Sequence, residues 1–492
     1  MNNLKKTLAL VAAMGLAMTA FVGCGEKKDD ATSETSAPAD TSAAADTDAA
    51  ADTDAAADTD AATDDTDAAA PAEDGDSSSW TAADSSLADD GDKFTIITWT
   101  TADLDNMFKA YGESDANTSG IAPEYALVGS SGSEAMEQYT TYFDGGEDVD
   151  LYCAEAGWIL DYITEADYAA NLSEIGLYAS DYSDAYQYTV DVATVDGELK
   201  GATWQAAPGG FVYRSDLADS YLGVKSPEEM QAKIGDWDAF WATAAEVSEA
   251  SDGKTKMAAS AGGVWQAYST GLNKTWVNDD MTLNTDGCED YINDINDAYN
   301  NGYIDETAQW TDAWFAEGQD DSTFGYFFST WCLPSGAQLE QASGGTEGAT
   351  YGKYDICVGP ANYFWGGTWL VVSPKCNNVT AAHDFVKYFT ADAEAMESYA
   401  ETYGDFVNNK TAMSNVASGD YSNPALGGAN QFAVLKDAAD GITMSDTMTK
   451  YDQSIKDAFN GAVTDNLGSD AETVMADFKD RVSSDIVDVT VE

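Results

Sequence analysis

The sequence predicts an α/β fold of two domains over residues 93 to 492, and three observations support this. Apolar strand-like runs alternate with amphipathic stretches in this region, which is typical of layered sheets and helices. About 400 residues are enough for two domains that each bury a core. Residues 25 to 92 have almost no large apolar side chains, so no core is expected there.

Residues 1 to 23 have the features of a lipoprotein signal peptide. Two lysines precede an apolar run, Leu8 to Val22, that is too short to span a bilayer together with its flanks. The sequence FVGC ends at Cys24 and resembles the lipobox, in which the cysteine becomes the diacylated, acylated N-terminus of the mature lipoprotein. We therefore expect a lipid anchor at Cys24 on the outer face of the cell membrane. The open alternative is a secreted protein with a coincidental cysteine.

Residues 24 to 92 are predicted to form a disordered acidic tether behind that lipidated cysteine. The hexapeptide ADTDAA recurs around Asp46, Asp52 and Asp58. Such sequence cannot bury enough apolar surface to offset chain entropy, and its carboxylates repel one another. An alanine-rich helix is the competing interpretation, but threonine and aspartate disfavour it. Residues 93 to 492 are expected to fold without this segment.

Charge and cysteine content exclude several classes of partner. The formal net charge of −65 makes nucleic acid and anionic lipid poor partners, so only the lipid anchor should contact the membrane. Five cysteines follow Cys24 without a Cys-x-x-Cys pair, and His383 is the single histidine, so we expect no metal and no cofactor. His383 is assigned a surface or capping role on a helix. Disulfide pairing stays open.

The individual elements follow from periodicity and turn residues. Asp196 and Gly197 form the tight turn of a hairpin that leads into the next strand. The predicted strands are 94–98, 148–154, 201–204, 355–358 and 368–372. The predicted helices are 225–250, 287–300, 380–400 and 450–485.

Aromatic residues suggest the kind of ligand. The chain has 13 Trp and 26 Tyr, and many stand beside Gly, Asp, Asn or Gln at predicted strand ends or in loops. In open α/β sheets, ligands bind beyond the carboxyl ends of strands. Aromatic rings can pack on the C–H faces of a sugar, whose hydroxyls need carboxylate and amide partners. A carbohydrate ligand is therefore plausible.

Four motifs resemble those of extracellular family 1 solute-binding proteins of ABC importers, the relatives of maltose-binding protein. Residues 201–214 (GATWQAAPGGFVYR) resemble the first crossing between lobes, followed by a leader helix at 215–222. Residues 359–372 (GPANYFWGGTWLVV) resemble the second crossing, with Gly-Pro before Gly-Gly and a strand. Residues 384–389 resemble the family's Phe-Ile-Lys-Phe helix, and 148–152 the strand before the first binding loop.

The resemblance implies a two-lobed, periplasmic-binding-protein-like fold of type II, with hinged lobes around a central cleft. The N-terminal lobe would comprise 93–203 plus 366–405, and the C-terminal lobe 204–365 plus 406–492. It further implies a monomer that is not an enzyme, with two partners: a carbohydrate ligand in the cleft, and the permease subunits of an ABC transporter that receive it.

The expected ligand-binding residues follow from the crossing motifs and from the aromatic loops. The stacking rings are Trp204, Trp365 and Trp331, with Trp99, Trp158 and Trp314 as further candidates, and Gly366 and Gly367 would let a ligand approach the backbone. The hydroxyl partners are Glu155, Gln205, Asp312 and Asp405, whereas Arg214 holds the lobe interface or a sugar edge. Two alternatives stay open. One is a surface glycosidase using carboxylates such as Asp103, Glu155, Asp312 and Asp405, and the other is a non-catalytic adhesion lipoprotein.

Overall fold

The computed structural model describes residues 75–129, 132–145, 149–272, 274–443 and 448–491. The predicted signal peptide, Cys24 and most of the predicted tether lie outside these residues. Within the described part, no helix is long and apolar enough to cross a membrane.

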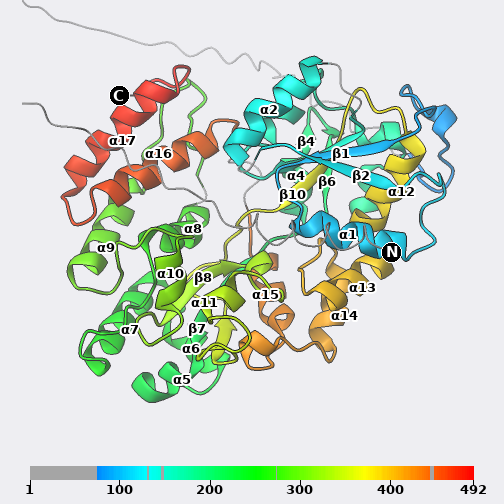
Figure 1. Ribbon diagram of the computed structural model, residues 1–492. Coiled ribbons are helices and arrows are strands. Elements are labelled where there is room, and N and C mark those ends of the chain that lie inside the picture. Colours follow the sequence, from blue (N-terminus) through cyan, green and yellow to red (C-terminus); the bar gives the residue numbers. More distant parts are fainter. Residues whose placement is uncertain (1–74, 130–131, 146–148, 273, 444–447, 492) are drawn as a thin grey trace, which may run out of the picture. The chain divides into compact units, whose positions relative to one another are not determined.

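The first lobe is built on a five-stranded mixed sheet in the order β2-β1-β3-β10-β6 (Figure 1). β1 pairs in parallel with both β2 and β3, whereas β10 runs antiparallel to its neighbours β3 and β6. The bounds of the strands are β1 Phe94–Thr98, β2 Pro123–Leu127, β3 Leu151–Glu155, β6 Gly201–Thr203 and β10 Thr368–Val372. The predicted strands 94–98 and 368–372 are thus confirmed. β2 was missed because each of its residues is at least partly exposed.

The second lobe is built on a three-stranded antiparallel sheet in the order β8-β7-β9. Its strands are β7 Gly209–Arg214, β8 Gly325–Ser329 and β9 Tyr354–Cys357. The small hairpin of β4 Thr194–Val195 and β5 Glu198–Leu199 turns at Asp196 and Gly197, both at positive φ as that tight turn requires.

Helices cover both sheets. The longer predicted helices break where a polar or glycine-containing turn intervenes, so that 225–250 becomes α6 and α7, 380–400 becomes α12 and α13, and 450–485 becomes α16 and α17. The helices before β10 are α1 Ala102–Gly112, α2 Gly132–Gly145, α3 Leu160–Ile163, α4 Gln187–Val192, α5 Ser215–Leu217, α6 Pro227–Lys233, α7 Trp237–Ala250, α8 Ala261–Gly271, α9 Cys288–Asn300, α10 Asp312–Glu317 and α11 Gln338–Ala342. Those after it are α12 Val379–Thr390, α13 Ala393–Tyr403, α14 Lys410–Ser418, α15 Gln431–Asp440, α16 Asp452–Asp465 and α17 Ala471–Asp485.

Two hydrophobic cores meet at the three-stranded sheet. Successive side chains of a strand point to opposite faces, so Val212 packs in the same core as the five-stranded sheet, whereas Phe211 and Tyr213 pack in the other. The second core is completed by helices such as α7, α9, α16 and α17, for example through Phe240 and Phe459. Each sheet therefore has its own apolar cover, and one core continues across both lobes.

The chain passes between the sheets more than once. β6 belongs to the five-stranded sheet and β7 to the three-stranded sheet, so the first passage is residues 204–208. The return from β9 to β10 runs through 358–367. The helices after residue 405 pack on different parts of the protein. α14 packs on α13, and α15 packs on β7 and β9. α16 and α17 join the second core beside α9 (Figure 1).

Residues 75–92, which the sequence analysis assigned to the tether, make specific contacts with the first lobe. The Glu174 carboxylate accepts hydrogen bonds from the backbone N–H and hydroxyl of Ser86. The Trp80 ring stacks on His383 with a centroid distance of 4.8 Å. Asp89 accepts hydrogen bonds from Thr380. The folded part therefore begins before residue 93, because a single tryptophan and a few polar side chains find partners that composition does not reveal.

The five described cysteines are all buried and free. His383 is partly buried on α12, and its Nδ1 lies 2.7 Å from the Ile175 carbonyl. Its ring thus serves packing and local hydrogen bonding.

Candidate functional site

Several strands of the five-stranded sheet end at one edge, where their following residues line two cavities between the lobes. β1 and β3 run in parallel, so Trp99 and Glu155 emerge at the same edge of the sheet. β10 begins at Thr368, which pairs with Glu155 in the antiparallel register. Gly366 and Gly367 therefore lie beside the same carboxyl ends.

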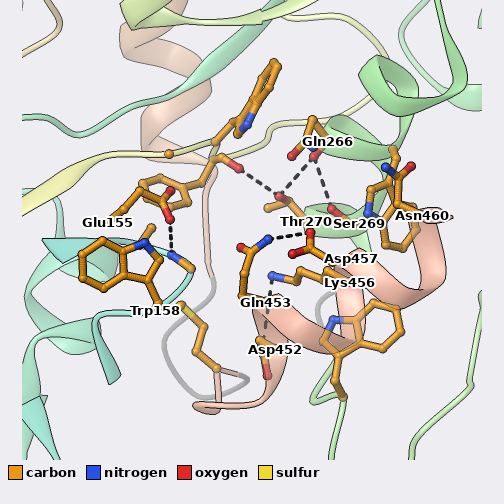
Figure 2. A pocket seen from close by; sticks show the side chains of 18 of the residues that line it. Glu155, Trp158, Gln266, Ser269, Thr270, Asp452, Gln453, Lys456, Asp457 and Asn460 are labelled. Atoms are coloured by element: carbon orange, nitrogen blue, oxygen red, sulfur yellow. Dashed lines mark hydrogen bonds and ion pairs between the residues drawn. The ribbon is translucent and has the colours of Figure 1, made fainter. Parts of the chain in front are cut away.

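One cavity, which we call the lysine cavity, has a volume of about 410 Å³. Trp99, Glu155 and Trp158 of the first lobe form one side, as Figure 2 shows for the latter two. The Trp99 and Trp158 rings meet edge to face at 5.2 Å. The Glu155 carboxylate accepts a hydrogen bond of 2.7 Å from the Gly157 N–H, which fixes its orientation in the wall.

The opposite side of the lysine cavity carries polar groups from α8 and α16 of the second lobe (Figure 2). Gln453 donates to Asp457 at 2.7 Å, and Lys456 lies 4.0 Å from Asp452. The remaining members of this side are Trp265, Gln266, Ser269, Thr270, Lys274, Trp276 and Asn460. Both donors and acceptors thus face the two tryptophans of the first lobe.

The other cavity, which we call the carboxylate cavity, has a volume of about 490 Å³. Its wall includes Asp103 and Asp405 of the first lobe and Trp331 of the second, and none of its described lining residues is a lysine or arginine. The further lining residues are Thr100, Asn106, Gln205, Pro334, Ser335, Gly336, Ala337, Gln338, Gly367, Thr368, Tyr399 and Tyr403.

The two cavities share a wall made of Trp99, Glu155, Trp365 and Gly366. Gly366 has a φ of +81°, and a Cβ there would lie 2.8 Å from Trp331 Nε1. That indole nitrogen donates to the Trp365 carbonyl at 2.8 Å. A glycine is therefore required at 366 both for the backbone conformation and for the approach of the Trp331 ring.

Burial raises the pKa values of the acidic groups of the site above their ordinary values. Burial raises the pKa of Glu155 from its ordinary value of 4.5 to about 7. Burial, and then the charge of Asp405, raise the pKa of Asp103, and burial also raises the pKa of Asp405. Asp405 is only 4% exposed, yet its two oxygens accept from Gln205 Nε2 at 2.8 Å and from the Phe406 N–H at 2.9 Å.

Most of the residues predicted for the site line these cavities. They are Trp99, Glu155, Trp158, Gln205, Trp331, Trp365, Gly366, Gly367 and Asp405.

Three of the predicted residues line neither cavity. Trp204 and Trp314 are 2% and 1% exposed and lie in the first core. Asp312 is exposed in the first turn of α10. The prediction that these three side chains line the binding site therefore does not agree with the structure.

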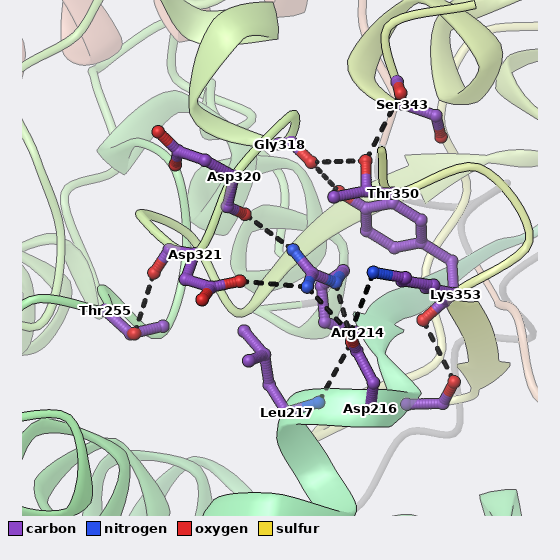
Figure 3. A network of polar contacts seen from close by, with 12 residues as sticks. Arg214, Asp216, Leu217, Thr255, Gly318, Asp320, Asp321, Ser343, Thr350 and Lys353 are labelled. Carbon is purple, nitrogen blue, oxygen red and sulfur yellow. Dashed lines mark hydrogen bonds and ion pairs between the residues drawn. The ribbon is translucent and has the colours of Figure 1, made fainter. Parts of the chain in front are cut away.

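Arg214 also lies away from the cavities, in a polar network at the end of β7 (Figure 3). Its guanidinium donates to both oxygens of Asp216 at 2.7 and 2.9 Å and to Asp321 at 3.0 Å. It also donates to the Asp320 carbonyl. Arg214 is only 1% exposed, so it holds the 320–321 turn against the strand within the second lobe. Its hydrogen-bond partners Asp216, Asp320 and Asp321 all belong to the second lobe, so these bonds do not join the two lobes.

The sequence analysis missed the polar face of α16 and the residues of α8. Gln453, Lys456, Asp457 and Asn460 recur at intervals of three or four residues, which places them on one face of the helix. That polar stripe was readable, but nothing local indicates that it faces Glu155 across a cavity. Trp265 and Gln266 repeat the Trp-Gln pair that drew attention at 204–205.

In the described part of the chain, no group of three or more His, Cys, Asp or Glu side chains could hold a metal ion. The groups that face the cavities are hydrogen-bonding partners and aromatic rings.

The fold and the site define a protein that binds a solute between two lobes, and comparison with known families agrees. Residues 106–428 match the family described as bacterial extracellular solute-binding protein. The chain belongs to this family, which confirms the resemblance and the prediction of a binding protein rather than an enzyme. A search of curated protein sequences finds no match.

Solved structures show the same fold at low sequence identity. A structure titled extracellular solute-binding protein family 1 has a TM-score of 0.68 at 20% identity, covering 80% of this chain and 99% of the other. The ABC transporter associated binding protein from B. animalis subsp. lactis, in complex with beta-1,6-galactobiose, has a TM-score of 0.62 at 19% identity, covering 82% and 99%.

A third structure is the galacto-N-biose-/lacto-N-biose I-binding protein of the ABC transporter from Bifidobacterium longum, in complex with lacto-N-biose. Its TM-score is 0.61 at 15% identity, covering 82% of this chain and all of the other. The predicted two-lobed fold is therefore confirmed.

Proposed function

We propose that this protein captures a sugar or short oligosaccharide in the two adjoining cavities between its lobes and delivers it to the permease of an ABC importer. The observation that carries the proposal is the shared wall, in which Trp99 and Trp365 stand beside the Glu155 carboxylate. A sugar has apolar C–H faces that pack on such rings, and hydroxyls that need polar partners at its edge.

The remaining groups of the site suit the same ligand. Gln266, Gln453 and Asn460 offer amide donors and acceptors on the side opposite Trp158. Cavities of about 410 and 490 Å³ fall in the range of small-molecule sites, and together they leave room for more than one sugar ring. The structural neighbours named above that were solved with galactobiose and lacto-N-biose bind disaccharides, which supports this ligand class.

Two passages of chain, 204–208 and 358–367, connect the sheets that carry the two sides of the site. Bending at such connections would close the lobes on a ligand, and the ligand's differential affinity for the closed form would drive that change. The closed form would then dock on the permease. A monomer suffices for this cycle, since one chain supplies both sides of each cavity.

We further propose that Cys24 carries the lipid anchor and that the protein works on the outer face of the cell membrane. Two or more acyl chains anchor a protein stably at a bilayer surface. Expressed in a bacterium that processes lipoproteins, the protein should partition into a detergent phase. Cys24→Ala should move it to the aqueous phase or leave it unprocessed. Unchanged detergent partitioning of the variant would contradict the anchor.

A binding panel tests the sugar itself. Isothermal titration with matched mono-, di- and trisaccharides of gluco and galacto configuration should find saturable binding, while chromatography of the same samples should find the sugar intact. Trp365→Ala is the site variant, and Trp241→Ala, from the second core, is its matched tryptophan control. Cleavage of the sugar would indicate a glycosidase, and the absence of binding across the panel would leave a scaffold role.

A further inference from the structure

Three tryptophans form a closed triangle at the wall of the two cavities. The Trp331 and Trp365 rings lie 5.2 Å apart, and Trp310 lies 5.9 Å from the first and 5.4 Å from the second. These separations are within the range of favourable aromatic pairs. Trp331 and Trp365 line the cavities, whereas Trp310 lines neither. Trp310 therefore stands behind the two rings that a ligand would meet.

The backbone of Trp310 adopts an unusual conformation. Its φ is +69°, in the left-handed region that favours glycine and is an outlier for a bulky residue. A glycine would adopt this conformation without steric cost, but it would supply no ring. The next residue, Thr311, caps α10 by accepting from the Trp314 N–H and donates to the Ala308 carbonyl, so the loop is held at both ends. Strain at this position indicates that the ring itself is needed.

The Trp310 ring joins the cavity wall to the core. Behind it lie the buried Trp314 at 5.0 Å and Phe315 at 6.4 Å. In front of it, Trp331 is fixed at its indole nitrogen by the hydrogen bond to the Trp365 carbonyl. Among the described residues, the indole nitrogen of Trp365 makes no such bond, and the aromatic rings beside it are those of Trp310 and Trp331. Removal of Trp310 would take away one of the two rings that hold the Trp365 ring in place.

We propose that Trp310 is a positioning residue that sets the orientation of Trp365 and Trp331 and thereby the selectivity of the site for sugar length. This inference rests on the proposed function. Trp365 faces both cavities, whereas Trp331 faces only the carboxylate cavity. A ligand long enough to enter both cavities depends on both rings, so it should lose more affinity than a short ligand when the support is removed.

The test compares Trp310→Gly, which keeps the backbone conformation and removes the ring, with Trp310→Phe, which keeps a ring. Trp237→Phe serves as the matched aromatic change in the second core. The first readout is the near-ultraviolet circular dichroism of the free protein, which reports the coupling of neighbouring indoles. The second is affinity across the sugar panel.

We expect Trp310→Gly to lose the near-ultraviolet band of the Trp331–Trp365 pair, which Trp310→Phe keeps, and to bind the longest sugar at least tenfold more weakly, with a smaller loss for a monosaccharide. Both variants lack the Trp310 indole, so the comparison between them excludes its own contribution to the spectrum. Trp310→Phe and Trp237→Phe should stay within threefold of the original affinity. Equal losses for all lengths, or affinities of Trp310→Gly within twofold of the original, would overturn the inference.

The free protein separates this inference from the function on which it rests. If no sugar binds but Trp310→Gly lacks the Trp331–Trp365 band that Trp310→Phe keeps, the positioning role stands and the proposed function fails. The same band in Trp310→Gly and Trp310→Phe overturns the positioning role whatever the sugars do. Should Trp310→Gly not fold, Trp310→Leu supplies the same two readouts, and an unaltered band and affinity in that variant would overturn the inference.

Discussion

The lysine cavity and the carboxylate cavity share one wall but differ in charge, and the difference follows the lobes. In the lysine cavity, Lys274 and Lys456 come from the second lobe. In the carboxylate cavity, Asp103 and Asp405 come from the first lobe. Aromatic rings stand at the boundary between them. A sugar crossing that boundary would meet carboxylates without a described lysine or arginine in one cavity, and both lysines and carboxylates in the other. If the proposed function holds, the shared wall should supply affinity and the two ends should supply selectivity.

The largest effect on binding is expected from the shared wall. Trp365→Ala should weaken every bound sugar by about 1 to 3 kcal/mol, because the ring serves both cavities. The melting temperature of the free protein should change little, since the ring is only partly buried. Titration calorimetry and a thermal melt check the two halves of this prediction.

Trp204→Ala provides the contrast. Trp204 is buried in the core, so its loss should destabilise the fold by roughly 3 to 5 kcal/mol while the folded protein keeps its affinity. The reverse pattern, with Trp365→Ala destabilised at unaltered affinity, would assign Trp365 to the core.

A smaller effect should separate the two ends. Asp405→Asn removes a charged acceptor from the carboxylate cavity, and Lys456→Met removes a charged donor from the lysine cavity. Each should cost about 1 kcal/mol of affinity, but only for sugars that reach the altered end. A trisaccharide should respond to both changes. Identical responses of all sugar lengths to both variants would mean that the two cavities do not act as separate subsites.

These predictions show what the sequence could and could not supply. The crossing motifs were readable because glycines such as Gly366 mark backbone that must pass close to a ring, and the turn at Asp196 and Gly197 marks a hairpin. The sequence did not predict which tryptophans lie in a core and which line a cavity. Trp204 and Trp331 both stand among small or polar neighbours in sequence, yet one is in the core and the other lines a cavity, since burial is decided by residues far away along the chain.

The site's second side shows the same limit more sharply. The polar stripe of α16 is local and visible, but it meets Glu155 only because the chain has passed between the sheets and returned. The end of the tether was misjudged for a related reason. Composition describes a whole segment, so it does not reveal that one residue, Trp80, stacks on the His383 ring of α12.

The pH dependence of the free protein should reveal the shared carboxylate. Because burial raises the folded-state pKa of Glu155 to about 7, the group stabilises the fold below about 4.5 and loses that contribution as pH rises toward 7. Asp103 and Asp405 act in the same direction, since burial raises their pKa values too. Between pH 5 and 8, the melting temperature of Glu155→Gln should therefore rise relative to the unaltered protein, by about 2 °C.

The exposed Glu165→Gln is the control for general charge effects, and it should keep a constant offset over the same range. A constant offset for Glu155→Gln as well would mean that Glu155 titrates as an ordinary solvated carboxylate.

The smallest effect on either cavity is expected from the segment 75–92, which lies against the first lobe away from the site. Trp80 stacks on His383, and a Cβ at Gly176 would lie 2.2 Å from the Trp80 ring, so the indole occupies a fitted position. Trp80→Ala should lower the free energy of unfolding by roughly 2 kcal/mol and leave sugar affinity within twofold. Denaturant unfolding and calorimetry measure the two quantities, with the exposed Ser79→Ala as control. If Trp80→Ala weakened the binding of long sugars without changing stability, the segment 75–92 would be coupled to the carboxylate cavity. That result would contradict the prediction that this segment stabilises the first lobe without affecting the site.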